Sequence, residues 1–293
     1  MSTLGDIVKK RECDTISVSG YGKEEEGKMK ITALVENESH CELVPKHGLS
    51  LYVETERHKL LFDVGPKGVL VENAHRRGID LASVDTVILS HGHYDHTGGL
   101  KEFLEENHHA KIYVRKSAFR RHFVKTRTGF YDIGLSKEWE THPQLLLLDG
   151  DTRIDEELLL FAPKGKDETF SPENASLFEE DAPDCFEHEQ NLIIREKKTA
   201  LLMGCGHMGV ANIMRCGAVF SPDLCIGGYH LFNPAQGTTV PRELLDRIAA
   251  ELRHYPTTDF YTCHCTGREA FEYLAAQMPN LRYLSCGESI TAE

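Results

Sequence analysis

The sequence predicts an α/β protein in which two mixed β-sheets pack face to face and helices cover the outer face of each sheet. The order of the predicted elements is strands followed by alternating helices and strands, and this order occurs twice. Apolar residues make up 40% of the 293 residues, which is enough for a sizeable buried core. No repeat of solenoid length and no low-complexity tract interrupts the pattern.

The first half begins with three predicted strands and continues with alternating helices and strands. The helix at 100–106 is the clearest, because its apolar residues share one face. Gly78 is typical of the residue that ends a helix. The predicted strands lie at 31–38, 50–56, 59–64, 85–89, 111–115, 144–148 and 158–162, and the predicted helices at 69–77, 100–106 and 117–125.

The second half opens with a predicted hairpin at 191–196 and 199–203 and then alternates strands with amphipathic helices. Pro241 suits the first turn of a helix, where its missing N–H leaves no bond unmade. The other predicted strands lie at 224–226, 259–261 and 282–286, and the helices at 210–215, 241–255 and 268–278. This half therefore predicts a second sheet with its own helical layer.

The chain divides into an extension and one domain. Residues 1–28 carry charge runs and few apolar positions, so we expect a mobile N-terminal extension, with an ordered docking role as the alternative. Residues 29–293 form the single predicted domain. The stretch 163–187, rich in Pro, Asp, Glu and Ser, is long for a loop, and we expect a lid over the functional site.

The segment 89–99, Leu-Ser-His-Gly-His-Tyr-Asp-His-Thr-Gly-Gly, lies between a predicted strand and a predicted helix. It places His91, His93, Asp95 and His96 in one turn at the C-terminal end of the strand. A polar surface turn is the simpler alternative, but four ligand-type side chains within six residues favour a metal site. Imidazole and carboxylate donors suit divalent zinc, iron or manganese.

Three further histidines, His207, His230 and His264, each follow a predicted strand and lie in a glycine- or threonine-rich turn. This shared context is the reason for joining them to the 91–96 turn. Strand alternation predicts that Cys263 and Cys265 face the packing while His264 faces the site. A zinc knuckle built on the two cysteines lacks a fourth ligand nearby. Six other histidines lie in polar contexts and are expected to be ordinary surface or core residues: His58, His75, His108, His109, His142 and His254.

Asp63 follows the predicted strand at 59–64 and precedes Gly65. A carboxylate at the C-terminal end of a buried strand lies where α/β proteins build their sites. The alternative is a helix N-cap, which Asp also fills well. We expect Asp63 to support a ligand by hydrogen bonding and not to bind the ion itself.

The His-x-His-x-Asp-His motif at 91–96 resembles the signature of the metallo-β-lactamase superfamily. The resemblance implies the four-layer αββα fold from about residue 29 to the end. It also implies two metal ions, which we assign to His91, His93 and His207 and to Asp95, His96 and His264. Many members carry a histidine before the 191–203 hairpin and a bridging Asp after it. Here His188 is the nearest histidine and Cys205 occupies the Asp position, so Cys205 is either a ligand or a small packed residue.

Four segments narrow the resemblance: Lys46–Ser50, Gly204–His207, Gly227–Leu231 and Cys263–Gly267. Together they look like the subgroup labelled 7,8-dihydropterin-6-yl-methyl-4-(β-D-ribofuranosyl)aminobenzene 5′-phosphate synthase. That label implies a phosphorylated, pterin-like substrate.

The implied activity is that of a dinuclear metal-dependent hydrolase acting through a metal-bound hydroxide on a small phosphorylated or ester-type substrate. The ions are expected to be zinc, with manganese or iron as alternatives. Asp95 would bind metal and orient the hydroxide, Asp63 would accept a ligand N–H, and His230 would contact the substrate or only pack. Alternatives are a pterin-related synthase that forms a C–N bond, an iron-dependent oxidoreductase, and a metal-binding or sensor protein without turnover. Diiron relatives usually carry Glu where His93 stands.

The net charge of −13 argues against nucleic-acid and membrane surfaces as partners, so we expect a small-molecule substrate, which could be anionic. The basic run at 120–125 is either a solvated face or a patch that steers anions. No apolar run reaches transmembrane length and the N-terminus lacks a signal-peptide core. Nine cysteines without a regular framework favour reduced thiols and a cytoplasmic location. The oligomeric state is left open.

Overall fold

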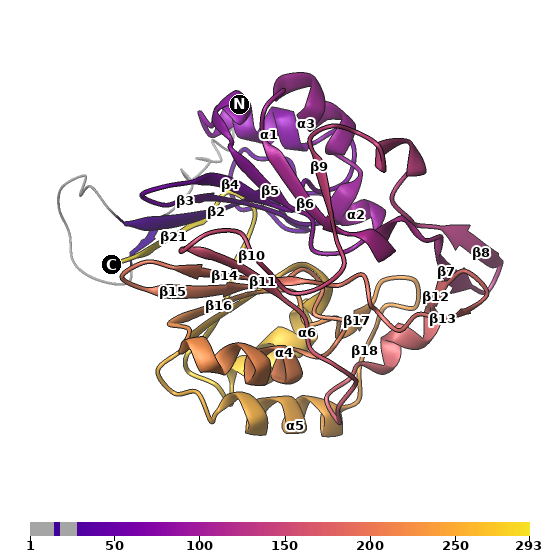
Figure 1. The fold of residues 1–293 in the computed structure, drawn as a ribbon. Coiled ribbons are helices and arrows are strands. Elements are labelled where there is room, and N and C mark those ends of the chain that lie inside the picture. The colour runs from indigo at the N-terminus through magenta and orange to yellow at the C-terminus, as the bar shows by residue number, and fades with distance from the viewer. Residues whose placement is uncertain (1–14, 18–27) are drawn as a thin grey trace, which may run out of the picture.

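The computed structural model describes residues 15–17 and 28–293, and it confirms the predicted αββα architecture. Figure 1 shows two sheets stacked face to face, one built mainly from the N-terminal half of the chain and one from the C-terminal half. The first sheet is mixed and contains, in spatial order, β1 (Thr15–Ser17), β21 (Ser289–Ala292), β2 (Met29–Val35), β3 (Ser50–Glu54), β4 (Lys59–Phe62), β5 (Thr86–Ile88), β6 (Lys111–Arg115) and β9 (Leu145–Leu148).

The second sheet is also mixed. Its first four strands run antiparallel to their neighbours, and the pairs from β15 onward are parallel. In spatial order it contains β10 (Thr152–Arg153), β11 (Leu158–Phe161), β14 (Asn191–Arg195), β15 (Thr199–Leu202), β16 (Leu224–Gly227), β19 (Asp259–Thr262) and β20 (Leu281–Tyr283).

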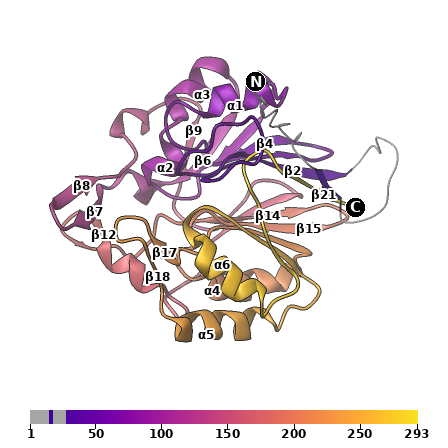
Figure 2. The ribbon, with the colours of Figure 1, turned by 180° about the vertical axis from the view of Figure 1, so that it is seen from behind.

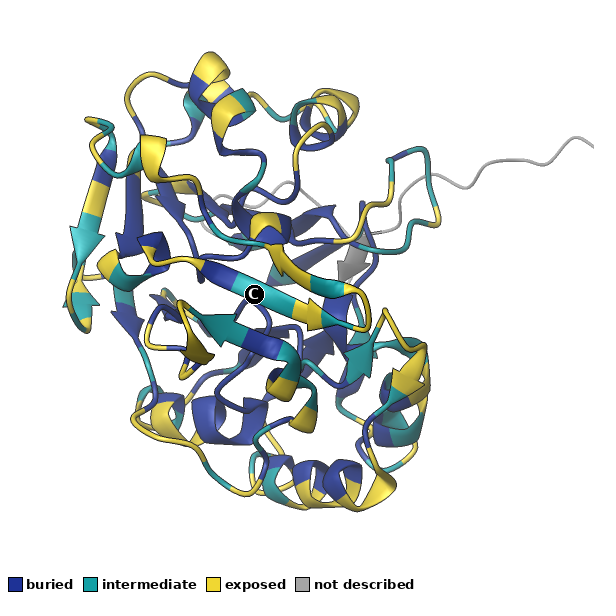
Figure 3. Cartoon of the chain, turned by 90° about the vertical axis from the view of Figure 1, so that its right-hand side faces the viewer, coloured by how far each residue is buried: buried dark blue, intermediate teal, exposed yellow. Residues whose placement is uncertain are grey.

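Three apolar cores hold the four layers together. The central core lies between the sheets, where Phe62 and Leu51 of the first sheet meet Leu202 and Tyr261 of the second. The outer face of the first sheet packs on α1 (Leu70–Arg76) and α3 (Leu100–Glu106). The outer face of the second packs on α4 (Val210–Gly217), α5 (Arg242–Leu252) and α6 (Arg268–Ala275), as Figure 2 shows from behind. Figure 3 shows the buried strands between helices whose outer faces are exposed.

The parallel strands bring chemistry to one edge of the sandwich. In the first sheet β4, β5 and β6 are parallel, so the segments after β4 and β5 leave at the same edge. In the second sheet β15, β16 and β19 are likewise parallel. The loops that carry the predicted site residues therefore all begin at carboxyl ends of neighbouring strands.

The predicted helix at 117–125 is wrong. A short 3₁₀ turn, η2 (Lys116–Phe119), is followed by the strand β7 (His122–Thr126), which pairs with β8 (Gly129–Asp132). β7 also pairs with β12 (Leu177–Glu179), and β12 pairs with β13 (Ala182–Pro183), giving a small four-stranded sheet at one side of the molecule. Phe, Val and Thr within β7 favour a strand, and the surrounding Arg and Lys residues hid that preference in the sequence.

The segment 163–187 contains the 3₁₀ turn η4 (Pro172–Ser176) together with β12 and β13, and its action as a lid stays a prediction. Strand β21 was not predicted and lies between β1 and β2. The predicted extension therefore contributes β1 to the first sheet, while residues 1–14 and 18–27 lie outside the described residues. The remaining short elements are η1 (Leu81–Ser83), α2 (Tyr94–Thr97), η3 (Lys137–Trp139), η5 (Ala218–Phe220), β17 (Phe232–Asn233), β18 (Thr238–Thr239) and η6 (His264–Thr266).

Among the described residues, no helix has the length and apolar character needed to cross a lipid bilayer.

Candidate metal centre

The 91–96 turn follows β5 and closes with the short helix α2, and its four ligand-type side chains are buried. The loop after β15 approaches this turn closely. Gly204 is required there, because a Cβ atom at this position would collide with Ser90 Oγ. Two distant segments thus meet at the strand ends.

The first group of candidate ligands is His91, His93 and His207, whose donor atoms all lie within 4.8 Å of one another. Each ring has a buried Nε2 atom without a hydrogen-bond partner among the described residues. Burial lowers the pKa of all three imidazoles well below the ordinary value, so each is neutral and keeps a lone pair. Buried lone pairs without partners are costly, and a shared cation would satisfy them.

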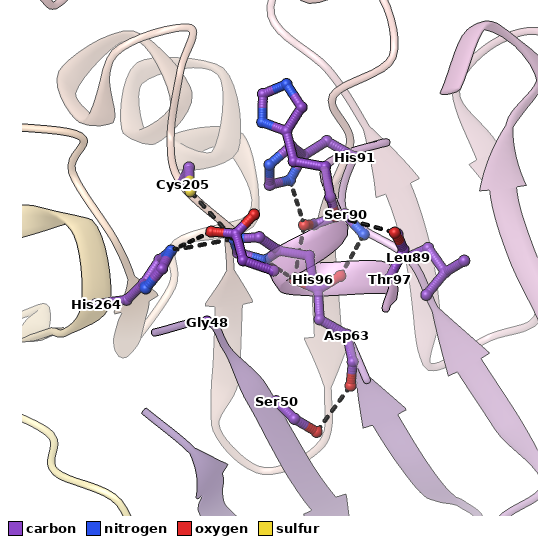
Figure 4. Close-up of polar contacts among 12 residues, drawn as sticks. Gly48, Ser50, Asp63, Leu89, Ser90, His91, His96, Thr97, Cys205 and His264 are labelled. Carbon is purple, nitrogen blue, oxygen red and sulfur yellow. Dashed lines mark hydrogen bonds and ion pairs between the residues drawn. The ribbon is translucent and has the colours of Figure 1, made fainter. Parts of the chain in front are cut away.

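The second group is Asp95, His96, Cys205 and His264, also within 4.8 Å. His96 Nε2 lies 3.1 Å from Cys205 Sγ and 3.2 Å from His264 Nε2. Asp95 Oδ2 lies 3.2 Å from His264 Nε2 and 3.7 Å from His96 Nε2. Donors bound at about 2.0–2.3 Å around a tetrahedral ion are roughly 3.3–3.7 Å apart, so these spacings fit one cation. Figure 4 shows His96, Cys205 and His264 pointing toward one another.

Cys205 therefore lies among the candidate ligands of the second group, an arrangement that the sequence left open. Burial raises the pKa of its thiol well above the ordinary value in the metal-free protein. A cation beside the sulfur would reverse that preference, because a coordinating thiol is deprotonated outright. The two groups together contain every residue that the sequence assigned to metal, and their role as ligands stays a prediction.

Asp63 lies behind the 91–96 turn and supports two of its histidines. Its Oδ2 atom lies 2.7 Å from His96 Nδ1 and also accepts a 2.7 Å hydrogen bond from Ser90 Oγ. Ser90 Oγ in turn lies 2.8 Å from His91 Nδ1. Burial opposes a charge on His96, but Asp63 and Asp95 raise the pKa of its imidazole to about 9. Both Nδ1 atoms are thus occupied, which leaves both Nε2 atoms for an ion.

Two asparagines hold the histidines of the second sheet in the same manner. Asn174 Oδ1 lies 2.9 Å from His207 Nδ1, while its Nδ2 donates to the His207 carbonyl at 2.8 Å. Asn37 Oδ1 lies 3.0 Å from His264 Nδ1, while its Nδ2 donates to the His264 carbonyl at 3.0 Å. Each amide therefore fixes the ring and the backbone of one histidine and turns its Nε2 inward. Neither asparagine carried a signal in the sequence.

Two buried glutamates hold the backbones of the same histidines. Glu189 accepts the N–H of His207 at 2.7 Å, and Glu36 accepts the N–H of His264 at 2.7 Å. Burial raises the pKa of Glu189 to about 7, and it also raises the pKa of Glu36. These buried carboxyl groups are compensated by two or more hydrogen bonds each, as burial of such a group requires.

Three residues at the site have positive φ angles although none is glycine: Asp63 (63°), His230 (49°) and His264 (52°). Such conformations cost about 1–3 kcal/mol each and persist where the surrounding structure imposes them. The side chain of Asp63 contacts His96, and the side chain of His264 belongs to the second ligand group. Three of the six non-glycine residues with positive φ in the described chain therefore lie at the candidate metal centre.

Two further histidines, His230 and His47, lie beside the two groups. The His230 ring is 4.3 Å from that of His207, and its buried Nδ1 has no hydrogen-bond partner within the described chain. His47 Nε2 lies 3.5 Å from Asp95 Oδ2, and its ring is 4.7 Å from that of His264. Burial, followed by the neighbouring His264, lowers the pKa of His47 to about 4. The sequence assigned His47 no role, although it lies in one of the segments that carry the resemblance.

The predicted common orientation of Cys263 and Cys265 is wrong. Strand β19 ends at Thr262, and the left-handed conformation of His264 breaks the alternation. Cys263 packs in the core between the sheets, whereas Cys265 Sγ accepts the N–H of His230 at 3.2 Å. Cys265 therefore lies beside the centre.

Three more buried residues near His93 were not predicted as site residues: His122, Asp184 and His188. His122 lay in the supposed basic helix, and His188 was considered only for the position that His207 fills. His58, excluded in the sequence analysis, lies between Asp85 and Asp155 far from the centre. The other five excluded histidines lie in none of the buried ligand groups.

The comparisons with known proteins agree with this geometry. Residues 43–168 match the family model described as the metallo-beta-lactamase superfamily. The crystal structure of Tm1679, described as a metal-dependent hydrolase of the beta-lactamase superfamily, superimposes with a TM-score of 0.71 at 25% identity, covering 89% of this chain and 98% of that one. In fold, in its ligand groups and in the matched part of its sequence, the chain resembles the metallo-β-lactamase superfamily.

Two proteins of Methanocaldococcus jannaschii are similar to the chain in sequence. The uncharacterized protein MJ0448 is 26% identical over 264 residues, which are 89% of this chain and 99% of that protein. The protein named 7,8-dihydropterin-6-methyl-4-(beta-D-ribofuranosyl)-aminobenzene-5'-phosphate synthase is 26% identical over 253 residues, 77% of this chain and 82% of that protein. The predicted resemblance to that subgroup is therefore found in the comparison.

Proposed function

We propose that the protein is a dinuclear metal-dependent hydrolase that acts on a small phosphorylated or ester-type substrate. One observation carries the proposal: two groups of buried donors lie side by side, with the His91 and His96 rings only 4.2 Å apart between their centres. Neighbouring cations about 3.5–4 Å apart are the usual arrangement for hydrolysis of phosphate and carboxylic esters.

The residues that would hold the first ion are His91, His93 and His207, and those for the second are Asp95, His96, Cys205 and His264. The sulfur donor of Cys205 favours zinc over manganese, whose preferred ligands are oxygens. When bound, such ions activate a water molecule and polarise the substrate. Manganese and iron are the alternatives for metal analysis to test.

Three residues of the chain would orient the attacking water, hold the ligand histidines and bind the substrate. Asp95, whose carboxylate is held ionised among histidines, would orient the attacking water through its oxygen. Asp63 would keep His96 and, through Ser90, His91 in the tautomer that presents Nε2. His230 Nδ1, buried and without a partner in the described chain, would donate to a substrate oxygen or a leaving group.

The substrate class is supported by one relative and one cavity. The M. jannaschii synthase is named for a 5'-phosphate compound. A cavity of about 1060 Å³ lies beside Phe186, whose ring stacks on His207 at 4.5 Å, and Lys116 and Lys164 are among its lining residues. The cavity offers room for a small substrate, but its lining also holds five acidic residues: Glu140, Asp149, Asp151, Glu180 and Glu187. The proposed preference for a phosphorylated substrate therefore rests on the name of that relative.

The second candidate function is a pterin-related synthase that forms a C–N bond, which only the name of that relative favours. We also propose a cytoplasmic location, since seven of the eight cysteines of the described chain carry free thiols, which persist in a reducing compartment; the eighth, Cys41, is disulfide-bonded.

The test combines metal analysis with a substrate panel. The purified protein should contain about two zinc ions per chain and should hydrolyse at least one class among phosphodiesters, phosphomonoesters, lactones and thioesters. Chelation should abolish turnover and zinc should restore it. Two bound irons with visible absorbance would favour the oxidoreductase, and metal without any turnover would favour a sensor.

A further inference from the structure

A further cluster of ligand-type side chains, separate from the two groups above, lies behind the 91–96 turn and consists of His122, Asp184 and His188. All three side chains are fully buried. Asp184 Oδ2 lies 3.1 Å from His122 Nδ1 and 3.1 Å from His188 Nε2. Their donor atoms, together with one of His93, lie within 4.8 Å of one another. The cluster is therefore either another cation site or a support for His93.

Ring separations argue against a cation between His122 and His188. Two imidazoles on one tetrahedral ion, with bonds of about 2.0 Å, have ring centres about 5 Å apart. The candidate ligand pairs have separations of 4.5 Å (His91–His93), 5.0 Å (His91–His207 and His96–His264) and 5.1 Å (His93–His207). The centres of His122 and His188 are only 4.0 Å apart, with the rings inclined by 40°. The two rings lie too close together for the directions of their lone pairs to meet at one ion.

Hydrogen bonds fix the proton positions instead. The Gly92 N–H donates to His188 Nδ1 at 3.0 Å, so His188 carries its proton on Nε2 and donates it to Asp184. The other oxygen of Asp184 accepts the Phe186 N–H at 2.7 Å. His122 then donates from Nδ1 to the same carboxylate. What remains is His122 Nε2, an acceptor that is buried without a partner in the described chain.

Among the five histidines assigned as ligands, His93 is the one whose second ring nitrogen has no hydrogen-bond partner among the described residues. The second nitrogens of His91, His96, His207 and His264 contact Ser90, Asp63, Asn174 and Asn37 respectively. No such contact is found for His93 among the described residues, and its ring centre lies 5.7 Å from that of His122. An imidazole that binds an ion through one nitrogen carries a proton on the other, and that proton needs an acceptor.

Backbone hydrogen bonds link the segments that carry His122 and His93. Ile133 donates its N–H to the His122 carbonyl at 2.9 Å and accepts the Tyr94 N–H at 2.8 Å. His93 itself forms an antiparallel bridge with Gly134. The segment that follows β8 is thus tied on one side to His122 and on the other to His93. The small sheet fixes the distance between them.

We propose that Asp184, His122 and His188 position the metal-binding turn: His188 holds the backbone at Gly92, and His122 accepts the outer N–H of His93. These are positioning residues, since they act through His93 on the first ion. The inference rests on the proposed metal centre. It assigns the small sheet a purpose, because pairing of β7 with β12 brings His122 to Asp184 from 62 residues away.

The test compares two substitutions of His122 in the zinc-loaded, full-length protein. His122→Leu removes the acceptor, whereas His122→Gln keeps an acceptor for His93 and a donor for Asp184. We expect His122→Leu to release the ion of the first group to a chelator 10- to 100-fold faster. His122→Gln should stay within about threefold of wild type, and its cobalt-substituted form should keep the wild-type visible spectrum. His254→Leu, the same change at an exposed histidine in the turn after α5, is the control.

Asp184→Asn gives the second arm if His122→Leu does not fold, with the melting temperature of the metal-free protein reporting folding. It should also speed release of one ion. Equal release from the Leu and Gln variants, or wild-type release from both His122→Leu and Asp184→Asn, would overturn the proposal. So would three ions in wild type with one lost in His122→Leu, which would indicate a cation in the cluster. A wild-type protein that binds no ion would instead overturn the metal centre itself.

Discussion

The two ends of the β-sandwich use histidine in opposite ways. At the carboxyl ends of the parallel strands, His91, His93 and His207 crowd together away from water, and burial lowers the pKa of each. At the other end His58 lies alone, with Nδ1 2.9 Å from Asp85 and Nε2 2.7 Å from Asp155. The hydrogen bonds to Asp85 and then to Asp155 raise its pKa to about 9. The three imidazoles of the first group are therefore neutral and His58 is a cation. His96 of the second group, beside Asp63 and Asp95, also has a raised pKa.

Both arrangements join the two sheets. Asp85 precedes β5 of the first sheet and Asp155 lies between β10 and β11 of the second, so His58 bridges them. At the metal end, Glu36 and Asn37 of the first sheet hold His264 of the second. The difference lies in what completes the contact. The ion pair at His58 is complete within the chain, whereas the buried lone pairs of His91, His93 and His207 have no partner among the described residues, and a bound cation would supply one.

The largest expected effect comes from removing a ligand of the 91–96 turn. His91→Ala or Asp95→Ala should remove bound metal and lower turnover by about 10³-fold or more, because several kcal/mol of charge stabilisation depend on the ions. Circular dichroism should still report a folded protein, since each side chain contributes little to the apolar cores. Metal content by elemental analysis and turnover on the best substrate are the measurements. Survival of both would show that the centre lies elsewhere.

Substitution of Cys205 tests whether its sulfur is a metal ligand in the second group. Cys205→Ser should weaken binding of one ion by about 10- to 100-fold, because the thiolate is replaced by a poorer donor. Cys265→Ser is the matched control. Its sulfur lies beside the same loop but contacts the backbone of Cys205 and His230. Zinc titration with a competing chelator separates the two, and loss of the ion from Cys265→Ser alone would reverse their assignment.

His230 should affect turnover without affecting metal. His230→Ala is expected to lower turnover by about 10- to 100-fold if the imidazole donates to the substrate or leaving group. Its ring is only 4.3 Å from the ring of His207, so metal content must be measured on the same sample. Loss of one ion would make His230 a ligand, and unchanged turnover would make it a packing residue.

The sequence predicted the parts of the centre that are local. The 91–96 turn carries four candidate ligands within six residues, and its position after a strand is visible in the pattern. His207 and His264 could be joined to it because each also follows a predicted strand. The parallel strands then bring these turns together, as the general rule for α/β sheets anticipates.

What the sequence could not predict depends on pairings between distant segments. Asn37 contacts His264 across 227 residues, and a lone asparagine after a strand carries no signal for that. His122 meets Asp184 only because β7 pairs with β12, and the basic residues around β7 favoured the wrong helix. Cys205 stayed ambiguous because a small thiol suits both packing and metal binding until its neighbours are known.

The smallest effect expected concerns His58 and the pH dependence of stability. Its folded-state pKa is raised from 6.5 to about 9, so its contribution is fully present below pH 6.5 and is lost as the pH rises through 9. The side chain is partly exposed, and solvent screening reduces the contribution to about 1–2 kcal/mol. Urea unfolding at pH 6.5, 8 and 9.5 should therefore show wild type losing this advantage over His58→Gln as the pH rises.

His75→Gln is the control, since His75 is exposed on α1. It should follow wild type at every pH. All three proteins should be compared after chelation, because ion binding is itself pH-dependent and would otherwise add to the unfolding free energy. If wild type and His58→Gln kept a constant difference from pH 6.5 to 9.5, His58 would not be charged between its two carboxylates. The contrast between the two ends of the sandwich would then be one of packing and not of protonation.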